Sequence, residues 1–272
     1  MYLEKDVSEA LARHVARAYA AAPGLAPDMV LSHETAAVLH GLTSDASLVP
    51  SLLQVSGPSS GAGATRKWRK VHATRLPPED VTTLSGVPIT TVARTVVDCA
   101  RTLPFIEAVP LADRLLRTGA RPEEVRLALI QVADRLAGCK GVQLARSVIA
   151  FADAGAANGG ESTVRVILST LGLPTPIVQY LICDPKDPYF KAWVDFAWPD
   201  LHTVLEFDGL VKYRAGNPSG RPGHDVLISE KRREDQLRAL GWHIVRITWS
   251  DLGRPEWIAV QLRQAFARGV RG

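Results

Sequence analysis

The sequence predicts an α/β protein whose two halves differ in architecture. The first half combines short strand-like runs with several helical segments, whereas the second half reads as helix, three strands, helix, strand and helix. A glycine-containing stretch of small residues, FADAGAANGGEST, separates the halves and places a domain boundary near Gly155. We therefore expect an α+β, mostly helical domain over residues 1–154 and a three-layer α/β domain with a short central mixed sheet over residues 155–272.

The first half begins with a charged amphipathic segment, MYLEKDVSEALARHVARAYAA, which predicts a helix. A second helix is expected in SHETAAVLHGL, with Ser32 as its N-cap. Three strand candidates follow: LLQVSG, KWRKVHATRL and VTTLSGVPIT. Four helical segments then start near Thr91, Phe105, Pro122 and Lys140.

The second half alternates helices with short apolar strands. Glycine and proline mark most of the breaks between them, and Gly241 stops the second helix. The expected helices are 162–171, 225–240 and 255–268, and the expected strands are 177–182, 192–198, 203–208 and 242–249.

The composition excludes several classes of protein. With 272 residues and 46% hydrophobic residues, the chain has ample material for two packed cores. Its three cysteines lie far apart without a CxxC pair, which argues against a disulfide framework or a zinc site. No apolar run approaches the ~18 residues that span a bilayer, and the first segment lacks a signal-peptide core. We expect a cytoplasmic protein without membrane association, and a net charge of +4 permits nucleic acid as a partner without requiring it.

Acidic residues stand inside two apolar strand candidates of the stretch VDFAWPDLHTVLEFDGLVKY. An unpaired carboxylate out of water is costly, so such acids are exposed at an edge, paired or bound to a cation. Alternation puts Glu206 and Asp208 on one strand face and Leu205 and Phe207 on the other. With Asp195 on the neighbouring strand, we expect the three acids to converge on one spot. Inward charges of an edge strand are the alternative interpretation.

Three further charged residues lie on helix faces that should meet the sheet. Glu161 lies one turn ahead of the apolar stripe of its helix, which includes Val164 and Leu168. It either points toward the sheet or is a first-turn acid favoured by the helix dipole. Glu230 and Arg233 fall in the middle of the apolar face of the next helix. A surface ion pair at i, i+3 spacing is the alternative for these two residues.

Carboxylates on adjacent strands suit a hard divalent cation such as Mg²⁺ or Mn²⁺, which prefers oxygen ligands and keeps sites for water and phosphate. Such an ion activates a water and polarises a phosphoryl oxygen. We expect Asp195, Glu206 and Asp208 to be the metal ligands. Lys212 is the nearest lysine in sequence that can assist the attacking water, and Lys231 is the second candidate.

The ordered set Glu161, Asp195, EFD at 206–208 and EKRREDQLRALGWHIVRITW resembles the restriction-endonuclease-like PD-(D/E)xK superfamily, in its branch of very-short-patch-repair-like proteins. The resemblance covers roughly residues 158–252. It implies a three-layer endonuclease fold and a Mg²⁺-dependent DNA endonuclease. Val194 replaces the superfamily's proline, and Asp208 stands where its lysine would be. Carried over by position, the catalytic residues are Glu161, Asp195, Glu206, Asp208, Lys212, Glu230 and Arg233.

A basic run with one tryptophan follows a glycine-rich stretch in the first half. A basic strand with an aromatic residue can contact phosphates and stack on a base, whereas a solvated strand with one packed tryptophan is the plain alternative. The candidate nucleic-acid-binding residues are Arg66, Lys67, Trp68, Arg69, Lys70 and Arg75.

The segments VLSHETAAVLHGL and GVPITTVARTVVDCARTLP resemble AbiEi-type antitoxin proteins. In other chains this region follows a winged helix, and we expect the recognition helix to be absent here. The resemblance implies a second possible function: an antitoxin or DNA-binding transcriptional regulator that uses an inactive nuclease scaffold and has a cognate toxin protein as its partner.

Overall fold

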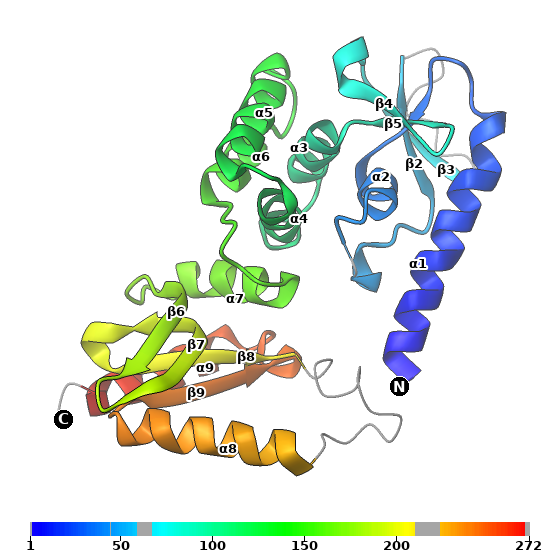
Figure 1. The fold of residues 1–272 in the computed structure, drawn as a ribbon. Coiled ribbons are helices and arrows are strands. Elements are labelled where there is room, and N and C mark those ends of the chain that lie inside the picture. The colour runs from blue at the N-terminus through cyan, green and yellow to red at the C-terminus, as the bar shows by residue number, and fades with distance from the viewer. Residues whose placement is uncertain (1, 44, 59–66, 210–223, 270–272) are drawn as a thin grey trace. The chain divides into compact units, whose positions relative to one another are not determined.

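The computed structural model describes residues 2–43, 45–58, 67–209 and 224–269 (Figure 1). The chain divides into two compact units, Tyr2–Ala154 and Gly155–Gly272, at the glycine-containing segment around Gly155. Each unit has its own sheet and its own core. In the described part of the chain, no helix has the length and apolar character needed to cross a membrane.

A five-stranded mixed sheet in the order β3-β2-β1-β5-β4 forms the centre of the first unit. Strand β1 pairs antiparallel with β2 and parallel with β5, and β3 runs parallel to β2 at one edge. The predicted strand 81–90 is a hairpin of two strands that turns at Ser85 and Gly86, both with positive φ. The strands are β1 (Val30–Leu31), β2 (Leu53–Gly57), β3 (Arg69–Ala73), β4 (Val81–Leu84) and β5 (Val87–Thr90).

Among the described residues of this unit, six α-helices accompany the sheet, and the four helical segments expected from Thr91 onward are all present. The sheet core joins Leu31, Leu53 and Ile89 to Ala18 of the first helix and Ala36 of the second. The helices are α1 (Tyr2–Ala21), α2 (His33–Leu39), α3 (Val92–Thr102), α4 (Phe105–Thr118), α5 (Pro122–Arg135) and α6 (Val142–Phe151). Short 3-10 helices are η1 (Ala22–Gly24), η2 (Ala46–Leu48) and η3 (Pro78–Asp80).

A buried ion network connects η3, α3 and α5. The fully buried Arg94 donates to Asp80 at 2.7 Å and to Asp98 at 2.8 Å. Arg135 adds a second pair to Asp80, and Arg101 adds one to Asp98 at 3.1 Å. Because an unpaired buried charge is strongly destabilising, these pairs favour the close packing of η3, α3 and α5.

Two stacked histidines lie where β3 meets the start of α2. The rings of His33 and His72 are 3.5 Å apart between centroids, with 14° between their planes. Ser32 is the N-cap residue of α2, as predicted, but its side chain makes no cap bond to the helix. Its Oγ is instead bonded to His33 Nδ1 at 2.9 Å and to Ser56 Oγ at 2.7 Å. Burial, followed by nearby cations for His33, lowers the pKa of each imidazole to about 3.

Acidification is therefore expected to destabilise the first unit. Below about pH 6.5 the unfolded chain protonates His33 and His72 while the folded chain does not, so the free energy of unfolding falls as the pH drops toward about 3. Urea unfolding of wild type and His72→Gln at neutral pH and near pH 5 measures this. The loss on acidification should be smaller in the variant, and equal losses would contradict the assignment.

The second unit is a three-layer arrangement around a four-stranded mixed sheet in the order β6-β7-β8-β9 (Figure 1). The predicted order of helix, three strands, helix, strand and helix is confirmed. The strands are β6 (Ile177–Asp184), β7 (Asp187–Trp198), β8 (Thr203–Asp208) and β9 (His243–Thr248), the helices are α7 (Gly159–Thr170), α8 (His224–Ala239) and α9 (Pro255–Gly269), and the 3-10 turns are η4 (Pro199–Leu201) and η5 (Trp249–Asp251).

Apolar side chains fix which helix covers which face of this sheet. Leu168 of α7 and Leu262 of α9 share one core with Leu205 and Phe207. Leu237 of α8 packs on the opposite face, in a core with other strand residues. Strands β6, β7 and β8 are antiparallel, and β9 runs parallel to β8 at the edge. The centre of the sheet, formed by β8 and the second half of β7, is thus covered on both faces, and its polar residues need partners within the unit.

Candidate functional site

Strands β7 and β8 part in the middle of the sheet. Their pairing joins Phe196–Trp198 to Thr203–Leu205, and beyond Leu205 strand β8 continues along β9 as far as Asp208. At the point of divergence the backbone N–H of Phe207 donates to Oδ2 of Asp195 at 2.8 Å. A side-chain carboxylate thus takes the place of a strand carbonyl. We call this position, where β7 and β8 diverge between Asp195 and Phe207, the fork.

Beside the fork, the side chains of β6 and β7 change the face of the sheet to which they point. Val178 and Phe196 pack with α7 and α9, whereas Tyr180 and Val194, two residues away along their strands, pack on the α8 face. Residues two apart in a regular strand share a face, so the alternation is broken between them. Gln179, which lies between the paired residues of β6, has φ +50°. A non-glycine residue in this region is strained, and such strain is often found at functional sites.

Glu161 approaches the fork from the first turn of α7, where its side chain is almost fully buried. Its backbone N–H donates to Oδ1 of the N-cap Asn158 at 3.0 Å, and its Oε1 accepts from the Asn158 amide at 2.6 Å. Its Oε2 accepts from the Ala157 N–H at 2.8 Å and from Gln179 Nε2 at 2.9 Å. Glu161 therefore combines both expected roles, since it stabilises the helix start and also faces the sheet.

Gln179 connects the two acids. Its Nε2 lies 2.9 Å from Oε2 of Glu161 and 3.4 Å from Oδ1 of Asp195. The sequence reasoning missed this residue, although a single polar side chain in the apolar run IVQYLI was a signal for it. The fork thus holds a chain of contacts from α7 through β6 to β7 and β8.

Glu206 lies on the α8 face of β8, next to the fork but with different partners. Its Oε1 is 2.9 Å from a guanidinium nitrogen of Arg233, and its Oε2 is 3.2 Å from Nε of Arg246. Leu205 and Phe207 lie in the core of the opposite face, so the predicted division of β8 into two faces is confirmed. Arg233 also faces the sheet, as predicted, and donates to the carbonyl of Trp193.

The remaining predicted catalytic residues lie further from the fork's contacts or outside the described part of the chain. Glu230 is 3.8 Å from Arg233 and its side chain is 43% exposed, which agrees with the alternative of a helix-surface pair. Asp208 is half-buried at the end of β8. Lys212 lies outside the described residues, and Lys231 is exposed on α8.

The structure does not gather Asp195, Glu206 and Asp208 into one three-acid group. Among the described residues, no three or more histidine, cysteine, aspartate or glutamate side chains are placed to hold a metal ion together. The reason is the reversed pleat: the Asp195 carboxylate is turned to Phe207 N–H and Gln179, whereas the oxygens of Glu206 are turned to Arg233 and Arg246.

A different pair of acids fits a hard divalent cation better. Glu161 and Asp195 each direct an oxygen at the same donor, Nε2 of Gln179. Mg²⁺ and Mn²⁺ are commonly held by one or two carboxylates, with water and phosphate oxygens completing the shell. The donor chemistry of this pair therefore suits such an ion. Glu206 does not fit in its observed arrangement, because each of its oxygens is paired with a cationic guanidinium group, whereas the hydrogen bonds given above for Glu161 and Asp195 come from neutral N–H donors.

The basic run of the first unit forms an edge strand. In β3 and its flanks, Lys67, Lys70 and Arg75 are exposed and Arg69 is half-buried. The guanidinium carbon of Arg69 lies 4.9 Å from the ring centroid of Trp68, which is 38% exposed. Arg66 lies outside the described residues. The exposed cations suit a nucleic-acid partner and also suit protection of a sheet edge.

Two relatives from Mycobacterium tuberculosis are similar to this chain: the uncharacterized proteins MT2308 of strain CDC 1551 / Oshkosh and Rv2248 of strain ATCC 25618 / H37Rv. Each is 32% identical over 189 residues, which span 68% of this chain and 64% of the relative. The chain thus covers slightly less than two thirds of each relative. No family model and no solved structure matches the chain.

The close approach of α7 to β8 generates a prediction about stability. A Cβ atom at Gly160 would overlap the ring of Phe207, so Gly160→Ala should move the start of α7 and with it Glu161. Overpacking of this kind costs about 1–3 kcal/mol. Urea unfolding measures the loss, and Gly253→Ala is the matched control because a Cβ there meets no atom within 4 Å. Equal stability of the two variants would contradict the close packing.

Proposed function

We propose that the second unit is a Mg²⁺- or Mn²⁺-dependent DNA endonuclease of the restriction-endonuclease-like superfamily. The observation that carries the proposal is the fork, where Asp195 of β7 and Glu161 of α7 direct oxygens at one donor beside a strand that ends in acids. The sequence resemblance also assigns catalytic roles to both residues. The order of elements and the coverage of both sheet faces by helices also agree with that superfamily.

Glu161 and Asp195 are the residues that would hold the ion. When bound, the ion lowers the pKa of a water and stabilises negative charge on the phosphate. Gln179 orients the two carboxylates through its amide, and Gly160 permits α7 to bring Glu161 to the sheet. Hydrogen bonds from backbone N–H groups limit the movement of both carboxylates, which favours a fixed geometry at the reacting phosphate.

Arg233 and Arg246 supply the positive charge that a DNA strand requires. A guanidinium group binds phosphate through two parallel hydrogen bonds, so an incoming phosphate competes with Glu206 for both arginines. Before substrate binds, Glu206 keeps the two guanidinium groups together on the α8 side of the fork. Once phosphate takes a guanidinium group, the carboxylate of Glu206 is released from that pair beside the bound strand.

The full chain is expected to nick supercoiled plasmid DNA in Mg²⁺ or Mn²⁺ and to lose this activity in EDTA. Loss of a group that only supports a metal ligand already costs roughly 10–100-fold, so Asp195→Asn and Glu161→Gln should lower the nicking rate at least about 100-fold. Asp200→Asn, in an exposed turn, is the matched control. The proposal fails if wild type and Asp195→Asn are equally inert with both metals, or equally active.

A second function is favoured by the pairing of Glu206 with two arginines, which neutralises the acid most central to the nuclease motif. In that case the protein is an AbiEi-like antitoxin or DNA-binding transcriptional regulator that retains the nuclease scaffold for binding, with a cognate toxin protein as its partner. The exposed cations of β3 and its flanks then contact phosphates without any metal.

Removal of two of these cations tests the second function. In EDTA, Lys67→Ala/Lys70→Ala should weaken duplex DNA binding and reduce the slope of log affinity against log salt by about two, because each lost phosphate contact removes about one unit. Fluorescence anisotropy with a labelled duplex measures both quantities. Arg121→Ala/Lys140→Ala removes two exposed cations elsewhere in the same unit and is the control. An unchanged salt slope in the first variant would exclude β3 as the DNA contact.

A further inference from the structure

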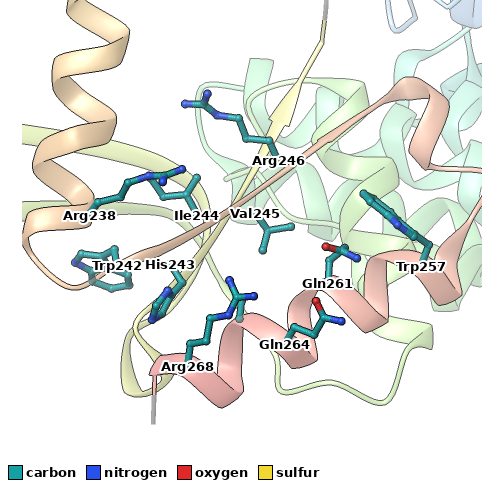
Figure 2. Close-up of a pocket in the computed structure, with 11 residues that line it drawn as sticks. Arg238, Trp242, His243, Ile244, Val245, Arg246, Trp257, Gln261, Gln264 and Arg268 are labelled. Atoms are coloured by element: carbon teal, nitrogen blue, oxygen red, sulfur yellow. The ribbon is translucent and has the colours of Figure 1, made fainter. Parts of the chain in front are cut away.

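A groove of about 280 Å³ follows the outer edge of β9, between this strand and the helices on its two sides (Figure 2). Strand β9 is the last strand of the sheet, so its outer backbone edge forms part of this surface. Figure 2 shows Arg238 and Trp242 on one side of the strand and residues of α9 on the other. The residues from α9 include Trp257, Gln261, Gln264 and Arg268.

The sequence of α9 explains this second surface. Trp257, Gln261, Gln264 and Arg268 follow a spacing of four, three and four residues, which places them along one side of the helix. Residues at neighbouring positions, such as Leu262, form the core contact with the sheet. The helix therefore has one apolar face for the core and, beside it, a stripe of aromatic, amide and basic groups that borders the groove.

The groove has a positive charge. Arg238, Arg246 and Arg268 line it, and none of its lining residues is acidic. Glu234 partly offsets the charge of Arg238 and Arg246, because its carboxylate oxygens lie 2.6 Å from Arg238 and 2.8 Å from Arg246. Arg268 is exposed and has no acidic partner within the described part of the chain. Three guanidinium groups along one strand edge are complementary to a chain of phosphates rather than to a single anion.

Tryptophan adds a preference for bases whose faces are accessible. Trp257 is 37% exposed at the groove, and Trp242 is half-buried beside the end of α8. Bases of a single strand stack on such side chains, whereas a duplex keeps its base faces inside its own stack. The amides of Gln261 and Gln264 offer donors and acceptors between the tryptophan and the arginine of the same helix.

We propose that this groove binds single-stranded nucleic acid, with the arginines on the phosphates and Trp257 stacked on a base. Arg246 also contacts Glu206, so the groove reaches the residues beside the fork. The inference deepens the proposed function, because it names unpaired DNA, such as the segments that negative supercoiling opens in a plasmid, as the substrate class of the nuclease site. It rests on that function only for the cleavage step, and binding itself is measured without metal.

The test is the affinity of the full chain for a fluorescein-labelled oligothymidylate in EDTA, measured by anisotropy over a range of salt concentrations. Trp257→Ala should weaken binding at least about fivefold because a stacked base is lost, and Trp257→Phe should retain most of it because a ring remains. Arg268→Ala should weaken binding and reduce the salt slope by roughly 0.7, the value for one phosphate of a single strand.

Matched controls lie outside the groove. Arg263→Ala changes an exposed arginine of the same helix, and Trp193→Ala changes a 60% exposed tryptophan of β7. Both should bind the oligonucleotide as wild type does. Urea unfolding of each variant establishes that it is folded, so that a loss of binding reflects the groove.

Three results would overturn the inference: wild-type affinity in both Trp257→Ala and Arg268→Ala, equal competition by a duplex of the same length, or equal competition by polyglutamate. Duplex competition would indicate general phosphate binding, and polyglutamate competition would indicate an acidic peptide partner.

Plasmid nicking separates this inference from the proposed function. If Asp195→Asn abolishes nicking while the groove variants bind normally, the groove is wrong and the nuclease stands. If nicking is absent while the groove variants lose binding, the groove stands without the nuclease.

Discussion

The candidate site depends on one hydrogen bond, from the backbone N–H of Phe207 to the carboxylate of Asp195. Where β7 and β8 part, this N–H loses a strand carbonyl as its acceptor, and an unsatisfied buried donor costs about 1–3 kcal/mol. The side chain of Asp195 satisfies it, which stabilises the fork and fixes the acid within the sheet. Gln179 then joins Asp195 to Glu161, so four elements, α7, β6, β7 and β8, meet at a position where each of these polar groups has a partner.

Arginine pairing determines the character of the neighbouring surface. Glu206 holds Arg233 from α8 and Arg246 from β9, and Arg246 extends into the groove along the sheet edge. The same pairing holds two guanidinium groups side by side and leaves each oxygen of Glu206 next to a cation. A hydrolase and a binding protein built on this scaffold would therefore share most of their phosphate contacts and differ at Glu161 and Asp195.

Much of the fold follows from local patterns. The period-two alternation of TVLEFD correctly separates Glu206 from Leu205 and Phe207, and the apolar stripes of the helices give their order and approximate ends. The two-residue strand β1 was missed because so short a segment has no measurable period. The convergence of Asp195, Glu206 and Asp208 was wrongly inferred, because regular alternation was assumed through Asp195 while the left-handed Gln179 beside it accompanies a reversed pleat.

By itself, the sequence determined the order of elements in the second unit, the two faces of β8 and the set of charged residues that required partners. These properties are local, because the side-chain period and the cost of an unpaired charge depend on a few neighbouring residues. Only the tertiary structure decided which acids meet. Which acids meet depends on the positive φ of Gln179 and on the close approach of α7 that Gly160 permits. It also depends on the arginines that α8 and β9 bring to Glu206. These features arise where segments distant in the chain pack together, so a local sequence pattern does not reveal them.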